Sequence, residues 1–363
     1  MSVRPFVEQD IPEAADLYWR YLRKGEGSAP PSVLSTFQEL FFDNPLVKGD
    51  SSSLVFEGKN GKVLGFLGVV PRKMCLDGEP VRVGFGGNLV VHPEARTSFA
   101  AARIISAFTA GKFDLYQSDS SNDMGRRLLD RMGFRTIPAL NIHWTRPLQP
   151  ARYAAYYAAR AAGSRADMVS LLAKPLCSLF DMVSAKLPVS PFRLNKSPLH
   201  GAELDLETHL QCLAEFRRGY SLWAEYDADS LKWLLNFMKR KPQRGTLRRI
   251  VVRDDGGNIV GWYIYYVKPG AVGEVVQIGG DPKLTKDLLD HLFYDAREQG
   301  VIALHGVVDL RRVPEFSEKN CVFTCRGGWA CSRSQKPEVL DALERGDAFL
   351  SRLDGEWCLL PGD

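Results

Sequence analysis

The residues between positions 81 and 103 have the types and spacing needed to hold an anion. They read VRVGFGGNLVVHPEARTSFAAAR. The β-branched and apolar run should form a strand that ends before Pro93, because proline cannot donate to a strand ladder. The run from Ser98 to Thr109 is rich in alanine and apolar on one side, which predicts a packed helix. The free N–H groups of such a helix would suit a phosphate or pyrophosphate at the strand's end. The alternative is an ordinary strand–turn–helix unit without a ligand.

Two aspartates are candidates for proton transfer. Asp119 and Asp309 each lie at the end of a predicted strand, at 113–118 and 303–309 respectively. A carboxylate at the end of a strand can orient or deprotonate a substrate through a water molecule. The alternative is that each aspartate caps the helix that follows it.

Length and composition limit the classes of function. The chain has 363 residues, which is enough for two or three domains, and 45% of them are hydrophobic and 25% charged. The net charge of +4 is compatible with an anionic small ligand and argues against duplex nucleic acid as a partner, which needs a concentrated basic face. No apolar run approaches the roughly 18 residues of a membrane span.

The seven cysteines indicate a reducing compartment. Their number is odd, and the N-terminal residues MSVRPFVEQDIPEA lack the apolar core of a secretory signal. We therefore expect a cytoplasmic protein without disulfides. Cys321, Cys325 and Cys331 lie close together in the sequence, but they form no CxxC pair and have no histidine at zinc spacing, so we expect no metal.

The first 147 residues alternate between predicted strands and helices. A strand at 3–6 is followed by helices at 11–22 and 32–42. Strands at 54–57 and 63–71 enclose an Asn-Gly turn, the strongest short hairpin signal. The strand at 81–91 and the helix from Ser98 come next. A strand at 113–118, a helix at 124–132 and a last strand from Ile137 to Trp144 complete this part.

Residues 148–200 differ from both flanking parts. Two apolar helices, at 151–162 and 168–187, are followed by Pro188, Pro191 and Pro198. The favoured interpretation is a helical bridge packed between two domains. The alternative is a surface that lies on a membrane or binds a partner.

Residues 201–363 repeat the first part loosely. The hairpins VFEGKNGKVLGFLGVV and VVRDDGGNIVGWYIYYV occupy matching positions, which indicates an internal duplication of one α/β unit. Gly279 and Gly280 precede a predicted helix and form either an anion-binding nest or a plain turn.

This order of elements resembles the GNAT acyltransferase superfamily, and more narrowly the bacterial tandem-GNAT proteins. The motifs that carry the resemblance are LVVHPEAR, NDMGRRLLDRMGF, FFDNP, VVP and GDAFLSRLDGEW. The resemblance implies an α/β fold with mixed sheets. It implies two tandem acyl-CoA N-acyltransferase-like domains, at 1–147 and 201–363, joined by a helical linker at 148–200. It also implies a sheet splayed beside its fourth strand and an acyl-CoA cosubstrate, without a metal.

The family's acyl-CoA loop, Arg/Gln-x-x-Gly-x-Gly/Ala, maps onto residues 96–101. Small residues at such a loop let backbone N–H groups reach a pyrophosphate. Phe99 stands at the first glycine of the motif, and Leu129 stands where the family often has a tyrosine that acts as general acid. The resemblance implies a cofactor-binding set of Leu89, Val90, Val91, Arg96, Thr97, Ser98, Phe99, Ala100, Ala101 and Asn122. The catalytic candidates are Asp119, Asn122 and Asp309.

The resulting hypothesis is acyl transfer from an acyl-CoA, such as acetyl-CoA, to a small-molecule amine. The amine would attack the thioester directly, and the backbone at 88–91 would polarise the carbonyl. Two alternatives stay open. One is a transferase whose donor is an aminoacyl-tRNA or an acyl carrier protein. The other is a module that keeps the fold and binds a ligand or partner without catalysis.

Overall fold

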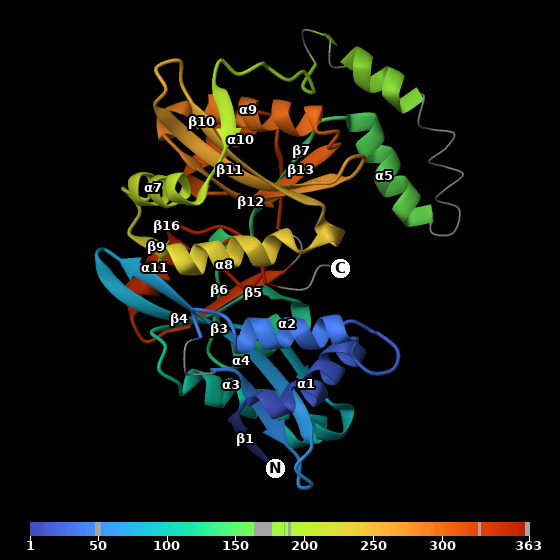
Figure 1. Cartoon of the computed structure of the whole chain (residues 1–363), viewed down its shortest axis with the longest axis vertical. Coiled ribbons are helices and arrows are strands. Elements are labelled where there is room, and N and C mark those ends of the chain that lie inside the picture. The colour runs from blue at the N-terminus through green and yellow to red at the C-terminus, as the bar shows by residue number, and fades with distance from the viewer. Residues whose placement is uncertain (48–51, 163–175, 185, 188–189, 326–327, 360–363) are drawn as a thin grey trace.

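The chain folds around two mixed β-sheets, which are stacked with helices between and outside them (Figure 1). The structure is a computed structural model, and it describes residues 1–47, 52–162, 176–184, 186–187, 190–325 and 328–359. The predicted mixed α/β class is confirmed. The helices are α1 (Ile11–Leu17), α2 (Pro31–Phe41), α3 (Ala100–Thr109), α4 (Asp123–Arg131), α5 (Pro150–Ala162), α7 (Leu206–Phe216), α8 (Ala228–Lys239), α9 (Thr285–Glu298), α10 (Val313–Glu318) and α11 (Pro337–Glu344).

The first sheet, sheet A, has the order β1-β2-β3-β4-β5-β15-β6, and β9 pairs with β3 and β16. Its strands are β1 (Ser2–Pro5), β2 (Leu54–Glu57), β3 (Val63–Leu76), β4 (Glu79–Val91), β5 (Leu115–Ser121), β6 (Arg135–Thr136), β9 (Leu222–Glu225), β15 (Trp329–Ser334) and β16 (Ala348–Phe349). The strands β2 and β3 form the predicted hairpin, with Gly61 at a φ of 79° in its turn. Helix α3 bridges β4 and the parallel strand β5.

The second sheet, sheet B, has the order β14-β7-β13-β12-β11-β10-β8. Its strands are β7 (His143–Pro147), β8 (His200–Glu203), β10 (Thr246–Arg253), β11 (Ile259–Val267), β12 (Val272–Gly280), β13 (Ala303–Val307) and β14 (Val322–Thr324). The hairpin β10–β11 corresponds to β2–β3, and the parallel pair β12–β13, bridged by α9, corresponds to β4–β5. The loose repeat in the sequence is therefore visible in both sheets.

The two halves exchange strands. β7 leaves the first half and pairs with β13 and β14 of sheet B, whereas β15 comes from the second half and lies between β5 and β6 of sheet A. The predicted last strand from Ile137 to Trp144 is therefore wrong. Its first part is a 3-10 turn at Pro138–Asn141, and only its end belongs to a strand, in the other sheet. The predicted boundary at residue 147 divides the chain in sequence, but each sheet contains strands from both sides of this boundary.

A large apolar cluster packs the two halves together. It contains Phe37 and Phe66 from the first half, Leu234 and Trp262 from the second, and Leu353 near the C-terminus. Separate clusters cover the outer faces of the two sheets, beneath α3 and α4 on sheet A and beneath α9 and α10 on sheet B. The molecule is thus layered as helices, sheet A, a shared middle layer, sheet B and helices.

The structure describes only part of the predicted helical linker at 148–200. α5 projects from the side of sheet B, and none of its residues at 150–161 is buried (Figure 1). The N-terminus of α5 is capped by Asp181, whose carboxylate accepts the backbone N–H groups of Ala151 and Arg152 at 2.8 and 3.2 Å. Asp181 belongs to the second predicted helix, at 168–187, of which residues 168–175 lie outside the described residues. No helix in the described part of the chain is long and apolar enough to cross a membrane.

Candidate functional site

Strands β4 and β5 separate partway along their length. Their pairing covers Val83–Phe85 opposite Leu115–Gln117 and then stops, although both strands continue. Asn88, with a φ of 56°, lies in a bulge of β4 beyond this point, where the register against β3 shifts. The edge of β4 that faces β5 therefore keeps backbone groups without a strand partner there. This opening matches the splayed sheet implied by the resemblance.

A cavity of about 760 Å³ fills the opening, and we call it the large cavity. Its apolar wall comes from β4, α3 and α4. Residues that line it include Leu67, Gly87, Asn88, Ile105, Phe108, Gln117, Ser118, Ser120, Leu128, Leu129 and Phe134. Tyr18, Tyr21 and Leu22, in a π-helical turn after α1, close one side. Ligand pockets commonly measure about 300–1,000 Å³, so the space suits a cofactor-sized molecule.

The structure divides the predicted cofactor-binding set. Leu89, Val90, Val91, Arg96, Ala101 and Asn122 line the large cavity, whereas Thr97, Ser98, Phe99 and Ala100 do not. Asn122 also caps α4, because its side-chain oxygen accepts the N–H of Gly125 at 2.8 Å. The N-terminus of α4 therefore faces the cavity.

Phe99 turns away from the large cavity. Its side chain is 76% exposed, and its backbone adopts a φ of 55°, in the left-handed region that favours glycine. The conformation explains why a glycine suits this position of the motif. The phenyl ring therefore points to solvent and does not fill the space where a phosphate would lie.

Sequence reasoning missed Glu356, a buried carboxyl group at the inner end of the large cavity. Its Oε1 accepts hydrogen bonds from the Ser120 hydroxyl at 2.6 Å, the Ser118 hydroxyl at 2.9 Å and the Asp119 N–H at 3.2 Å. Its Oε2 is buried without a partner. A Cβ at Gly87 would lie 1.8 Å from Oε2, so only glycine at this position of β4 leaves room for the carboxyl group.

Asp119 and Glu356 form a buried pair of carboxyl groups. Burial raises the pKa of Asp119, and burial together with the neighbouring Asp119 carboxylate raises the pKa of Glu356. Two adjacent negative charges are costly in a protein interior, so the pair holds one proton between them near neutral pH. Asp119 lies within β5, and Asn122 caps α4 instead, so the capping alternative for Asp119 is wrong.

Cations and a tyrosine hold the C-terminal residues 350–359 in this place. The guanidinium groups of Arg244 and Arg352 both pack on the Trp357 indole, with their central carbons 4.0 and 4.5 Å from its ring centroids. The Lys241 ammonium donates to the Cys358 carbonyl at 2.6 Å, and the Tyr226 hydroxyl donates to Asp354 at 2.7 Å. These contacts fix the backbone on both sides of Glu356.

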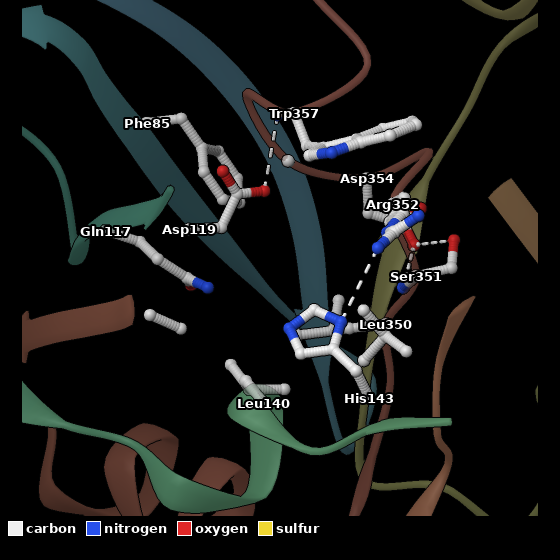
Figure 2. Close-up of a pocket in the computed structure, with 13 residues that line it drawn as sticks. Phe85, Gln117, Asp119, Leu140, His143, Leu350, Ser351, Arg352, Asp354 and Trp357 are labelled. Carbon is white, nitrogen blue, oxygen red and sulfur yellow. Dashed lines mark hydrogen bonds between the residues drawn. The ribbon is translucent and has the colours of Figure 1, made fainter. Parts of the chain in front are cut away.

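A second cavity, of about 60 Å³, lies between the two sheets, and we call it the small cavity. Figure 2 shows Gln117, Asp119, His143 and Arg352 grouped around it. Gln117 and Trp357 line both cavities, so the two spaces adjoin at β5 and the C-terminal residues. Burial and the nearby Arg352 lower the pKa of His143 to about 4, so this imidazole is neutral near pH 7.

The other sequence candidates lie elsewhere. Asp309 lines neither cavity: it caps a 3-10 turn by accepting the Arg311 N–H at 3.0 Å, and it accepts a hydrogen bond from the Tyr220 hydroxyl. The capping alternative therefore holds for Asp309. Gly279 and Gly280 end β12 and form neither a nest nor a turn, because they pair with Trp262 and Gly261 of β11.

No cluster of three or more metal-ligating side chains occurs among the residues that the structure describes. Cys321 and Cys331 are buried in different apolar clusters, one beneath each sheet. Cys321, Cys325 and Cys331 are therefore neighbours in the sequence without gathering at one site in the structure.

No protein-family model and no curated protein matches the sequence. Solved structures do match. A conserved protein of unknown function from Enterococcus faecalis, described as a probable N-acyltransferase, has a TM-score of 0.60 at 12% identity, over 92% of this chain and 72% of that one. A GCN5-related N-acetyltransferase from Anabaena variabilis has a TM-score of 0.59 at 12% identity, over 94% and 74%.

The chain has the GCN5-related N-acetyltransferase fold. An N-myristoyltransferase from Saccharomyces cerevisiae, solved with bound myristoyl-CoA, also matches, with a TM-score of 0.51 at 11% identity over 91% of this chain and 78% of that one. Each match covers more than nine tenths of this chain, so the likeness to the acyltransferase fold includes both sheets and not one half alone. The fold predicted from the sequence resemblance is thereby confirmed.

Proposed function

We propose that the protein transfers an acyl group from an acyl-CoA to a primary amine. The observation that carries this proposal is the large cavity between the separated strands β4 and β5, with the Glu356 carboxyl group at its inner end. A cavity with apolar walls, an arginine and a helix N-terminus suits a long donor that has an apolar arm and an anionic end.

The donor would lie along β4. Arg96, at the edge of the cavity, would pair with a phosphate, and the N-terminus of α4 at Asn122 would face the same ligand. Backbone N–H groups of β4 at 88–91 that face β5, where β4 has no strand partner, would donate to the thioester oxygen. Such a donor polarises the carbonyl group and stabilises the negative charge that develops on its oxygen.

The buried carboxyl pair would accept the proton. The amine nitrogen attacks the thioester carbon, a C–N bond forms, the C–S bond breaks, and the proton lost by nitrogen passes to the Asp119–Glu356 pair. A carboxyl pKa raised towards neutrality makes a better general base at neutral pH than an ordinary carboxylate. The pair retains one negative charge at that pH, so it can accept one proton.

The thiolate would leave without a protein acid. Leu129 lines the large cavity on α4, at the position where the resemblance places a tyrosine that acts as general acid, and a leucine has no proton to give. An ordinary thiol has a pKa near about 8.5, so the thiolate is a competent leaving group and takes its proton from water.

The test is release of free thiol from acetyl-CoA and longer acyl-CoAs in the presence of a mixture of small amines. We expect wild-type protein to release thiol in an amine-dependent manner and Glu356→Gln to be slower by about 100-fold, the lower range for loss of a general base. Glu338→Gln, which changes an exposed glutamate of α11, is the matched control and should keep the wild-type rate. Absence of thiol release from every donor, or an unchanged rate in Glu356→Gln, would overturn the proposal.

A further inference from the structure

The walls of the small cavity contain buried polar atoms that lack hydrogen-bond partners. Gln117 is 3% exposed and its Oε1 has no partner. Arg352 is 7% exposed, and its Nε and Nη1 have none. Asp119 lines the same space, and its carboxyl group shares the proton of the carboxyl pair with Glu356. Buried polar groups are normally paired, so a cluster of unpaired ones around one space indicates a ligand that completes them.

The charge of Arg352 is incompletely matched by the protein. Its nearest carboxylate, on Glu274, is 3.8 Å away, beyond hydrogen-bond distance. Its Nη2 donates to the Nδ1 of His143 at 3.4 Å, and this imidazole is neutral near pH 7. Arginine binds carboxylates in a two-pronged manner, so an anionic group of this kind would satisfy the free N–H groups.

The opposite side of the same space is acidic. Asp119 belongs to the buried carboxyl pair. Its Oδ2 accepts a long hydrogen bond, 3.5 Å, from the backbone N–H of Trp357 (Figure 2). A protonated amine would be attracted to this side. The small cavity therefore places a cationic and an anionic side chain around one volume, with the amide of Gln117 on the wall that it shares with the large cavity.

We propose that the small cavity binds the amine acceptor, and that this acceptor is a small amino acid whose carboxylate pairs with Arg352 and whose amino group faces Asp119. The inference deepens the proposed function and rests on it for the direction of transfer. The two volumes support this division, because about 60 Å³ suits a small polar head group and about 760 Å³ a cofactor-sized donor. The shared wall at Gln117 and Trp357 brings the amino group to the inner end of the donor's cavity.

Direct binding tests this inference separately from catalysis. Each of the common amino acids and its primary amide, which lacks the carboxylate, is titrated calorimetrically into wild-type protein without any acyl-CoA. We expect at least one amino acid to bind about 10- to 100-fold more tightly than its amide, the range for a hydrogen-bonded charged group. In Arg352→Gln the two forms should bind equally.

The matched control is Arg217→Gln. Arg217 also packs on a tryptophan, with its central carbon 5.0 Å from the Trp223 ring, but it lines neither cavity, so its loss should leave the ratio between acid and amide unchanged. Thermal unfolding of each variant reports whether it is folded, and the wild-type ratio decides the question even where a variant does not fold.

Equal binding of acids and amides by wild type, absence of binding by any amino acid, or a ratio preserved in Arg352→Gln would overturn the inference. Binding with the expected ratio but without thiol release from any acyl-CoA would instead overturn the proposed function, so the two failures are distinguishable.

Discussion

The Glu356 side chain makes stability depend on pH. Burial and the Asp119 carboxylate raise its pKa in the folded state, so the folded protein binds a proton more tightly than the unfolded chain does. This contribution to the free energy of unfolding is fully present below the ordinary pKa of 4.5 and is lost as pH rises through the raised value.

We therefore expect the melting temperature to fall as pH rises from about 5 to about 8, and Glu356→Gln to remove part of this fall. Glutamine keeps an oxygen for Ser118 and Ser120 but carries no charge. Each unit of raised pKa corresponds to about 1.4 kcal/mol, so the difference between wild type and variant should be measurable by calorimetry at the two pH values. A fall of equal size in both proteins would contradict the assignment.

Substitution of Phe99 by glycine should stabilise the folded protein. A non-glycine residue in the left-handed conformation costs roughly 1–2 kcal/mol of stability, and because the Phe99 ring is exposed, its burial offsets little of this cost. We expect Phe99→Gly to be more stable than wild type by about 1 kcal/mol in urea unfolding. Phe99→Ala loses the same ring but keeps its Cβ and the strain, so it should not be stabilised. Equal stability of the two variants would show that the ring, and not the backbone, is responsible.

At the scale of elements, the separation of β4 from β5 creates the site, and Gly87 permits the carboxyl group to enter it. A methyl group at this position would lie 1.8 Å from Glu356 Oε2. We expect Gly87→Ala to displace Glu356 and to lower the rate of thiol release by about 100-fold, as Glu356→Gln does. The rate is measured at a temperature where the variant is folded.

Gly84→Ala is the control for general damage to β4. Its methyl group would press on the Phe113 ring, 2.5 Å away, on a part of the strand that does not line the large cavity. It should cost stability while leaving thiol release intact. A similar loss of activity in both variants would mean that the strand as a whole, and not the space beside Glu356, is responsible.

The same elements show what could be predicted from the sequence. The hairpin β2–β3 and the unit β4–α3–β5 depend on local signals, namely the Asn-Gly turn, Pro93 and the apolar spacing. The positions of these elements followed from the local signals, whereas the lining residues Arg96, Ala101 and Asn122 came from the resemblance to the acyltransferase motifs. Asp119 was identifiable as the polar residue near the end of a strand.

Long-range pairing could not be predicted. Strand β15 pairs with β5, more than 200 positions earlier, and the fold of β7 into sheet B depends on partners beyond position 300. Glu356 lies in the run Asp354-Gly355-Glu356, which has the composition of an exposed turn. Only the serines of β5, 236 and 238 positions away, make it a buried acceptor.

At the scale of the whole molecule, the exchange of strands makes each half dependent on the other. Residues 1–147 alone would lack β15, leaving the edges of β5 and β6 unpaired, and would lack the C-terminal residues 350–359. We expect separately expressed 1–200 and 201–363 to be unfolded or aggregated, because exposed apolar edges associate. Coexpression of the two should restore a folded complex, measured by size-exclusion chromatography and circular dichroism.

A cooperatively unfolding monomer of either half alone would contradict this dependence. It would also mean that the boundaries at 147 and 201 separate independent folding units, in spite of the strand exchange.

Calorimetric titration of the full chain with CoA tests whether the large cavity holds the acyl donor. Ala101 lines the cavity at the start of α3, so Ala101→Trp should fill the space without touching the carboxyl pair. We expect wild type to bind one CoA per chain and folded Ala101→Trp to bind CoA at least about tenfold more weakly. Absence of binding by wild type, or equal binding by both proteins, would contradict it.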